Sequence, residues 1–348
     1  ARSLSLPARP PPLSVDEWHA CLDGSGRVVR EQWLRERIFY GGVSSRARPL
    51  VWPYLLGSHD PTETTAQRKQ TRSLRRAEFA AYRQQWQSIT PAQEKRFKWY
   101  RTLKENIRKD VLRTDRTHPF FEGDLNPHLQ QLDVILRTYA FFHFDLGYEQ
   151  GMNDLLSPLL YVLRDEVETF WCFVGLMENL QFNFLAECDG IPKQLAAVAK
   201  CLQVFHPPLH QHLVTNKADS LIFCFRWILV IFKREFSYPE TLQLWEILWS
   251  RHLCPFFHLF VVIALLVHFA DPILAQRMKL EDIMQFVNDQ ACHIQLIPLL
   301  QSAEAIYRQA YPHLSKSMRA ELSQLKCTAP FSVPPLNKPS TDFVSGQK

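Results

Sequence analysis

Apolar side chains recur at spacings of three and four residues along much of this chain. The pattern is clear in residues 97–107 and again in residues 129–139. Such spacing places the apolar side chains on one face of an α-helix. Glycine, which weakens helices, accounts for only 11 of the 348 residues, whereas leucine, arginine and glutamine are abundant. The sequence therefore predicts an all-α fold of many helices with no significant sheet.

The length of the chain predicts more than one helical core. With 348 residues, 46% of them hydrophobic, the chain exceeds the size at which a single core usually stops growing. We expect one domain of two helical lobes at about residues 36–165 and 166–310. We also expect a proline-rich leader with a short helical segment in residues 1–35 and a C-terminal extension in residues 311–348, disordered from about residue 328.

Individual helices can be placed from the same spacing and from the positions of proline and glycine. The first lobe is expected to contain helices at residues 15–22, 30–40 and 52–56, a long basic helix from residue 60, a helix capped by Thr90 that ends near Arg113, and helices at 129–139 and from about 150. The second lobe is expected to contain helices at residues 166–176, 191–202, 218–234, 240–249, 253–270, 280–286 and 296–310. The apolar segment 253–270 barely reaches membrane-spanning length and contains Pro255, so we interpret it as a buried core helix.

Two short runs combine residue types that can act on phosphate. Residues 107–114 (IRKDVLRT) place Arg113 near the carboxylate of Asp110, and residues 147–154 (GYEQGMND) place Gln150 between two glycines. An arginine keeps its charge, and its planar guanidinium matches phosphate oxygens. A glutamine amide donates and accepts hydrogen bonds at once, which suits it to holding an attacking water. In GTP hydrolysis these two roles carry most of the catalysis, so the runs predict action on a partner's phosphate.

At these residues the chain resembles the TBC-domain family of Rab GTPase-activating proteins. The family's I-x-x-D-x-x-R motif is matched by Ile107, Asp110 and Arg113, and its Y-x-Q motif by Tyr148 and Gln150. Further resemblance lies in Gly42, Val43, Arg48, Trp52, residues 55–57, 225–227, 232–236 and 244–246. The resemblance implies an all-helical domain that activates a GTP-bound Rab GTPase by supplying Arg113 and Gln150 in trans. The alternative is a non-catalytic scaffold that binds Rab-GTP.

Other residues of the motifs are expected to support these two. Asp110 can hold the Arg113 guanidinium in its working rotamer. Tyr148 is either a core aromatic or a contact to the partner, and we favour the contact because tyrosine is enriched at interface centres. Asn153 and Asp154 are interpreted as caps of a first helical turn that orient the loop before them.

Three further residues are given structural roles. Arg48 and Trp52 lie four residues apart on one helix face and are expected to fix the first helices beneath Arg113. Arg226 lies in an apolar run, where an unpaired charge would be costly. We therefore expect Arg226 to have a buried acidic partner.

Charge is concentrated in one part of the chain. Residues 66–116 contain 15 Lys and Arg against 5 Asp and Glu, a local balance of +10, although the net charge of the whole chain is only +5. A positive field there would steer an anionic partner, either a nucleotide-loaded GTPase or an acidic lipid surface. The alternative is a solvated arginine-rich helix face. Nucleic acid is not expected, because the aromatic residues at positions 86, 97, 99 and 100 also fit the buried side of a helix.

The sequence predicts no metal or cofactor of its own. It contains no G-x-x-x-x-G-K-[ST] phosphate loop, so GTP and Mg²⁺ are expected to be carried by the Rab partner. The spacing of Cys201, His206, His210 and His212 does not fit a zinc site. The eight cysteines form no C-x-x-C pair and are typical of a reduced, cytoplasmic protein. Given the resemblance, we expect peripheral contact with endomembranes, by analogy endosomal or autophagic, and no transmembrane segment.

Overall fold

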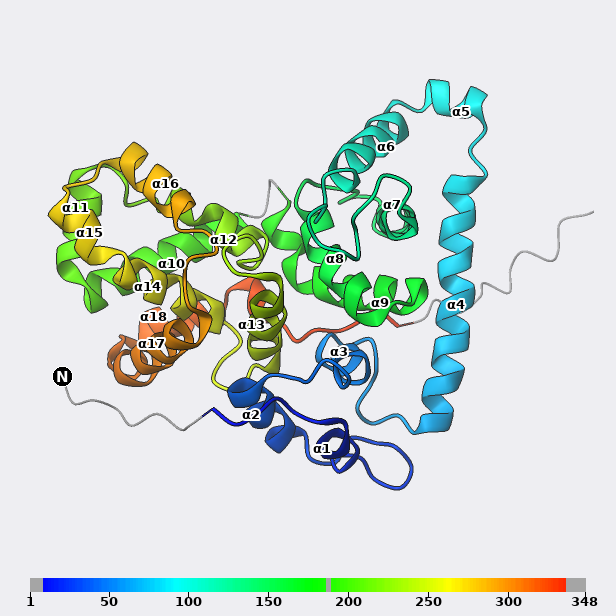
Figure 1. Ribbon diagram of the computed structural model, residues 1–348, viewed down its shortest axis with the longest axis horizontal. Helices are drawn as coiled ribbons and strands as arrows, with labels where there is room; N and C mark the ends of the chain where they lie inside the picture. Colours follow the sequence, from blue (N-terminus) through cyan, green and yellow to red (C-terminus); the bar gives the residue numbers. More distant parts are fainter. Residues whose placement is uncertain (1–8, 186–188, 336–348) are drawn as a thin grey trace, which may run out of the picture.

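The computed structural model describes residues 9–185 and 189–335. These residues form helices joined by loops, and within them we find two isolated β-bridges and no strand. Figure 1 shows two groups of helices, α1 to α9 and α10 to α18, with α13 near the line along which the groups meet. The predicted all-α fold is confirmed.

The first group is built around α7. Its elements are α1 (Val15–His19), α2 (Glu31–Gly41), α3 (Arg48–Leu55), α4 (Thr65–Gln87), α5 (Pro91–Arg96), α6 (Lys98–Val111), α7 (Pro127–Phe142), α8 (Met152–Leu163), α9 (Glu166–Leu180) and the 3-10 turn η1 (Gln181–Asn183). Helix α7 contacts α4, α6, α8 and α9. Helix α9 therefore belongs to the first group, and the division that we predicted at residue 165 lies after α9 instead.

The second group is built around the apolar helix α14. Its elements are α10 (Gly190–Phe205), α11 (Pro207–Thr215), η3 (Ile222–Cys224), α12 (Phe225–Leu229), α13 (Tyr238–Ser250), α14 (Phe257–His268), α15 (Ala270–Ala275), α16 (Leu280–Asp289), α17 (Leu296–Ala310), η4 (Tyr311–His313), α18 (Lys316–Ser323) and η5 (Lys326–Thr328). Helix α14 packs against α10 and α17 and is buried along almost its whole length. No helix in the described residues is long and apolar enough to cross a membrane. The interpretation of this segment as a core helix is confirmed.

The continuous helix predicted at residues 218–234 is wrong. Leu221, Ile231 and Phe232 adopt left-handed backbone conformations, with φ of 54°, 46° and 57°, so only η3 and the five residues of α12 are helical there. Such conformations are costly for bulky side chains and persist only where the surroundings impose them. Here the indole nitrogen of Trp245 donates to the carbonyl of Ile231 at 2.8 Å. Tertiary packing has overridden the helical periodicity.

The helices that lead to Arg113 begin and end at recognisable signals. Thr64 and Thr90 cap α4 and α5, each in a reciprocal pair with a glutamine three residues later, so α4 begins at Thr65 and not at residue 60. The single helix predicted after Thr90 is broken at Phe97, whose φ and ψ of −96° and 79° separate α5 from α6. The predicted delivery of Arg113 just past a helix end is confirmed, because α6 ends at Val111.

The segment after α17 is more ordered than the sequence predicted. It forms η4, α18 and η5, and residues 329–335 then continue without regular structure. Arg251 lies over the ring of Phe331 at 4.6 Å, and the amide of Asn179 donates to the carbonyl of Ala329. The disorder expected from residue 328 is therefore wrong for residues 328–335. The remainder of that prediction, residues 336–348, lies outside the described residues.

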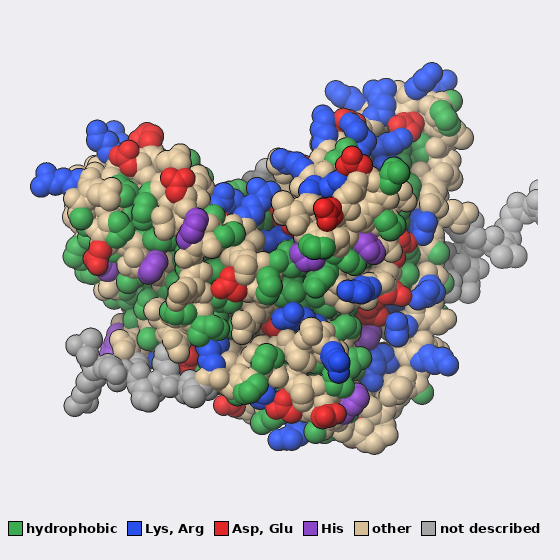
Figure 2. All heavy atoms as spheres, viewed as in Figure 1, with side chains coloured by type: hydrophobic (Ala, Val, Ile, Leu, Met, Phe, Trp, Pro, Cys, Tyr) green, Lys and Arg blue, Asp and Glu red, His purple; other side chains and the backbone are tan. Residues whose placement is uncertain are grey.

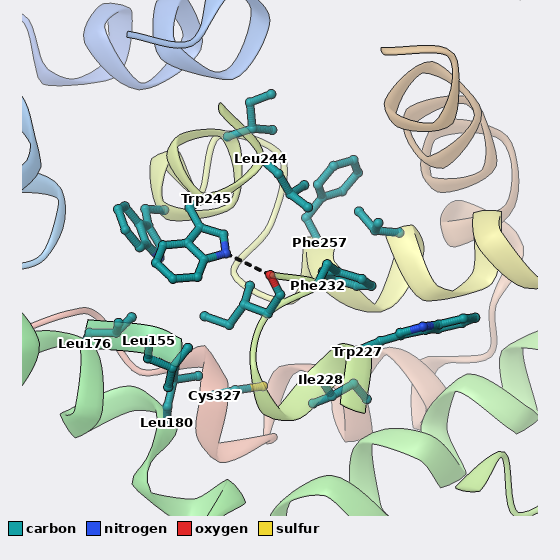
Figure 3. Packing of buried hydrophobic residues seen from close by; sticks show 14 of the residues in the cluster. Leu155, Leu176, Leu180, Trp227, Ile228, Phe232, Leu244, Trp245, Phe257 and Cys327 are labelled. Carbon is teal, nitrogen blue, oxygen red and sulfur yellow. Dashed lines mark hydrogen bonds between the residues drawn. The ribbon is translucent and has the colours of Figure 1, made fainter. Parts of the chain in front are cut away.

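One hydrophobic core runs through both groups of helices. Figure 3 shows Leu155 and Leu176 of the first group near Trp245 of α13, with the bond from Trp245 to the segment after α12 drawn as a dashed line. Phe232 and Trp245 have no exposed surface. Because the core is shared, the two groups of helices are held in one relative position.

A buried carboxylate also ties the first helices to α13. Glu246 has no exposed surface, and its Oε1 accepts hydrogen bonds from Arg48 Nε at 2.6 Å and Trp52 Nε1 at 2.9 Å. Its Oε2 accepts from the backbone N–H of Val43 at 2.9 Å. Burial raises the pKa of Glu246, and Arg48 opposes that effect. The structural role expected for Arg48 and Trp52 is thus seen, but they bind α13 and do not contact Arg113.

We predict that Glu246→Ala lowers the free energy of unfolding by about 3 to 5 kcal/mol, because the half-buried guanidinium of Arg48 would lose its carboxylate. Chemical denaturation measures this change. The control is Glu31→Ala, which removes a solvent-exposed pair with Arg35 in α2 and should change stability by less than about 1 kcal/mol. Equal effects of the two substitutions would contradict the role given to Glu246.

Candidate active site

Arg113 lies in the turn that follows α6. Its backbone N–H donates to the carbonyl of Asp110 at 3.1 Å, so the chain makes one further turn after the helix ends. The Arg113 side chain is 57% exposed. A cation at this position is available to a second molecule.

The carboxylate of Asp110 holds the Arg113 guanidinium. Oδ1 of Asp110 accepts from Arg113 Nε at 3.0 Å and from Nη2 at 2.7 Å. The Asp110 residue itself is buried, with 6% of its surface exposed. Hydrogen bonding and charge attraction from Asp110 raise the pKa of Arg113, so the guanidinium stays fully protonated. Asp110 is therefore in contact with the Arg113 guanidinium, and the supporting role that the sequence suggested for it stays a prediction.

Tyr148 supports Asp110 from the other side. Its hydroxyl donates to Asp110 Oδ2 at 2.6 Å, and its ring is buried. Burial, followed by the hydrogen bond to Asp110, raises the pKa of Tyr148, so the hydroxyl keeps the proton that it donates. The partner contact that we favoured for Tyr148 does not fit this position, because the ring faces the interior. The core-aromatic alternative fits it.

Asn153 joins the turn after α6 to the start of α8. Its Oδ1 accepts from the backbone N–H of Gly151 at 3.2 Å, and its Nδ2 donates to Thr114 Oγ1 at 2.9 Å. The Thr114 hydroxyl in turn donates to the carbonyl of Asp110 at 2.7 Å. The side chain of Asn153 thus orients the 147–151 loop and fixes its distance from α6. The helix cap predicted at Asn153 is wrong, because Gly151 is the N-cap of α8 and no described side chain caps that helix.

Gln150 lies at the surface of this loop. It is exposed and sits between buried Tyr148 and Gly151, which begins α8 with a φ of 107°. A Cβ on Gly151 would meet Val230 at 3.4 Å and Leu229 at 3.5 Å. These distances are ordinary van der Waals contacts, so it is the positive φ that favours glycine at this position.

A second set of charges joins the site to the segment after α12. Lys233 Nζ donates to both oxygens of Asp115 at 2.6 and 2.7 Å and lies 3.4 Å from Asp154 Oδ1. Arg234 Nη2 donates to Asp154 Oδ2 at 2.7 Å, and Ser157 Oγ donates to Asp115 Oδ2 at 2.7 Å. Asp154, in the first turn of α8, is therefore an ion-pair partner of Lys233 and Arg234 and not the helix cap that the sequence suggested.

These groups surround an open hollow of about 700 Å³. Its lining includes Arg113, Asp154, Lys233, Arg234 and Tyr238. Figure 2 shows the molecular surface indented between the corner formed by α5 and α6 and the second group of helices. The hollow thus receives charged side chains from both groups of helices.

Sequence reasoning found one half of this site and missed the other. The structure brings together five of the predicted residues: Asp110, Arg113, Tyr148, Asn153 and Asp154. Gln150 lies on the loop that carries Tyr148. Arg48 and Trp52 lie elsewhere, on Glu246. The contributions of Thr114, Asp115, Ser157, Lys233 and Arg234 were missed. The available signal was the adjacent pair of cations in residues 232–236, Lys233 and Arg234, which follows an apolar run.

Arg226 has the acidic partner that we expected. Its Nε donates to Glu235 Oε1 at 2.8 Å and its Nη2 to Glu235 Oε2 at 3.1 Å. Glu235 is buried, with 1% of its surface exposed. This pair closes the turn that carries Lys233 and Arg234, and the prediction of a buried partner is confirmed.

The basic stretch is divided between structural pairs and an exposed corner. Arginines of α4 pair with the start of α9, in the pairs Arg72–Glu168, Arg76–Asp165 and Arg83–Glu166, at 2.8 to 3.5 Å. Figure 2 shows the exposed Lys and Arg side chains gathered over α5 and α6. Three arginines of the stretch thus pair with the start of α9, which favours the helix-face alternative for that part.

No group of three His, Cys, Asp or Glu side chains in residues 9–185 and 189–335 is arranged to hold a metal ion. His206 and His212, which the sequence raised as zinc candidates, have other partners. The ring of His206 accepts from the N–H of Leu209 at 3.2 Å and caps α11, a helix that the sequence analysis did not predict. A ring nitrogen of His212 lies 2.8 Å from the carbonyl of Met278.

Comparison with solved structures places this fold beside known domains. The Ypt/Rab-GAP domain of Gyp1p superimposes with a TM-score of 0.73 and 20% sequence identity, over 86% of this chain and 98% of that one. A Chlamydomonas flagellar RabGAP TBC domain superimposes with a TM-score of 0.64 and 18% identity, over 83% of this chain and 89% of that one. At these identities the likeness establishes the fold.

Comparison of sequences establishes the family. Human TBC1 domain family member 17 is 38% identical over 95% of this chain and 51% of its own length, and human member 16 is 36% identical over 85% and 39%. GTPase-activating protein GYP7 of Yarrowia lipolytica is 35% identical over 86% and 44%. The chain thus spans about half the length, or less, of these relatives. The family model for the Rab-GTPase-TBC domain matches residues 45–274. The chain therefore belongs to the Rab-GTPase-TBC domain family.

Proposed function

We propose that this chain is a GTPase-activating protein for a Rab-family GTPase, with Arg113 and Gln150 as the residues that enter the partner's nucleotide site. The observation that carries the proposal is the exposed Arg113 guanidinium held by the buried carboxylate of Asp110. Family membership and relatives named as GTPase-activating proteins support the same activity.

In the proposed mechanism the GTP and Mg²⁺ arrive on the GTPase. Arg113 approaches the phosphate oxygens and neutralises charge that develops as the terminal phosphoryl group leaves, while the Gln150 amide orients the attacking water. Asp110 stays on the guanidinium and acts as a positioning residue. No general base is required from this chain, because the loose transition state needs little proton removal from the water. We propose a cytoplasmic protein in peripheral contact with the endomembranes that carry such GTPases.

The second candidate function is a scaffold that binds Rab-GTP without accelerating hydrolysis. Single-turnover GTP hydrolysis against a panel of Rab GTPases, with binding measured in parallel, separates the two functions. Stimulation of at least one Rab supports the activator. Binding without stimulation for every Rab that binds would overturn it and leave the scaffold.

We predict that Arg113→Ala and Arg113→Lys each lower the stimulated rate about 10³- to 10⁵-fold, which corresponds to about 4 to 7 kcal/mol of barrier. Lysine keeps the charge but loses the planar guanidinium. The matched control is Arg108→Ala, because Arg108 pairs with Glu105 at the same three-residue spacing on α6 and is 56% exposed. Full stimulation by Arg113→Lys would refute the guanidinium mechanism.

Gln150→Ala is expected to lower the stimulated rate constant about 10²-fold or more, because the attacking water would no longer be oriented. The neighbouring exposed residue gives the control, since Glu149→Ala changes the same loop without removing the amide. Single-turnover kinetics at saturating activator measure both variants. If Gln150→Ala and Glu149→Ala retained equal and full activity, Gln150 would have no part in the reaction.

Tyr148→Phe should lower the stimulated rate about 10-fold while leaving the thermal stability close to that of the parent. The ring stays buried, and the change removes the hydrogen bond that fixes Asp110 behind Arg113, a net loss of about 1 kcal/mol. Tyr40→Phe is the control, because it removes another buried hydroxyl from a carboxylate, Glu304, at a distant position. A similar rate loss in both variants would mean that Tyr148 acts only on stability.

A further inference from the structure

Lys233 is placed where three segments of the site meet. It follows α12 in the second group of helices, and its side chain is only 4% exposed. Its ammonium group bonds both oxygens of Asp115, which lies two residues after Arg113, and lies 3.4 Å from Asp154 in the first turn of α8. One buried cation thus contacts the turn that carries Arg113 and the helix that begins beside Gln150.

The turn that carries Arg113 needs such an anchor. Asp115 adopts a left-handed backbone conformation with a φ of 47°, which non-glycine residues adopt only where the surroundings hold them. The side chains that hold it are Lys233 and Ser157, both through the Asp115 carboxylate. Without the ammonium group, the largely buried carboxylates of Asp115 and Asp154 would lose the cation that they share, and their repulsion would favour a different turn.

We propose that Lys233 is a positioning residue for Arg113: it acts through Asp115 to hold the 113–117 turn in the conformation that presents the guanidinium. The proposal rests on the proposed function. Although Lys233 lines the hollow, its ammonium group is engaged by Asp115 and Asp154, and no hydrogen bond joins it to Arg113 within the described residues. Its contribution is therefore to geometry, and misplacement of a catalytic group by about 1 Å can lower a rate about 10²-fold.

The first experiment measures kinetics of Lys233→Met. We expect kcat to fall about 10- to 100-fold with less than about 3-fold change in KM for the GTP-loaded Rab, since the docking surface is kept. The control is Arg37→Met, which removes a partly buried ion pair with Glu17 at 2.9 Å, far from the site. The melting temperature of Arg37→Met should fall by about as much as that of Lys233→Met, but its kcat should not fall. Unchanged kcat in Lys233→Met would overturn the proposal.

The second experiment tests whether Lys233 acts through Arg113. In an Arg113→Ala background, Lys233→Met should cause no additional loss of rate, because a misplaced turn no longer matters when it carries no guanidinium. If adding Lys233→Met to Arg113→Ala still lowered the rate by the same factor as in the parent, the proposal would be overturned. Should Lys233→Met fail to fold, Asp115→Asn weakens the same pair from its more exposed side, and failure of both variants to fold would assign Lys233 a purely structural role.

The third experiment needs no GTPase and separates this proposal from the proposed function. Amide hydrogen exchange in residues 113–117 should be faster in Lys233→Met than in the parent, and unchanged in Arg37→Met. Unchanged exchange in both variants would count against the anchor whatever the activity. If the parent stimulated no Rab but the exchange result held, the proposed function would fail while the anchoring of the turn by Lys233 stood.

Discussion

The arrangement of the site depends on a buried carboxylate with both of its oxygens occupied. Asp110 receives the Arg113 guanidinium on Oδ1 and the Tyr148 hydroxyl on Oδ2. A buried carboxylate is costly unless it is paired and hydrogen-bonded, so neither partner can leave without penalty. Since Arg113 follows α6 and Tyr148 precedes α8, this single group sets the position of one loop against the other. The bond between Tyr148 and Asp110 also positions Gln150, because Gln150 follows Tyr148 by two residues on the same loop.

Buried carboxylates with hydrogen bonds to both oxygens also occur near the line along which the two groups of helices meet. Glu246 holds Arg48 and Trp52 against α13, and Glu235 closes the turn after α12 on Arg226. Burial raises the pKa of both carboxylates, because desolvation disfavours their charged form. Apolar side chains of similar volume would often be no less stable. A carboxylate, however, accepts bonds only from particular directions, so these pairs fix relative position where a purely apolar contact could slide.

Local pattern predicted the parts of the fold and site that local interactions determine. The spacing of three and four residues placed α6 and its end before Arg113. The separation of three positions between Asp110 and Arg113 already implied their pairing. The break in 218–234 was not predictable from local pattern, because its second half, at Ile231, is bonded to Trp245 of another helix. Lys233 was missed because its two carboxylates are 118 and 79 residues away along the chain. Tyr148 was misjudged because a buried and an interfacial tyrosine satisfy the same motif.

The division of exposed and buried side chains is what action on another molecule requires. Arg113 and Gln150 are exposed while Asp110, Tyr148, Asn153 and Lys233 are buried. The two side chains that we propose to act on the partner are therefore accessible, and the residues around them are not. Holding a long side chain in one rotamer before binding reduces the entropy lost when the partner docks. The guanidinium has five N–H donors, and Asp110 engages it only through Nε and Nη2. The Nη1 side of the guanidinium therefore remains available for phosphate oxygens while Nε and Nη2 stay bonded to Asp110. Arg113 could thus contact a nucleotide without losing the hydrogen bonds that orient its side chain.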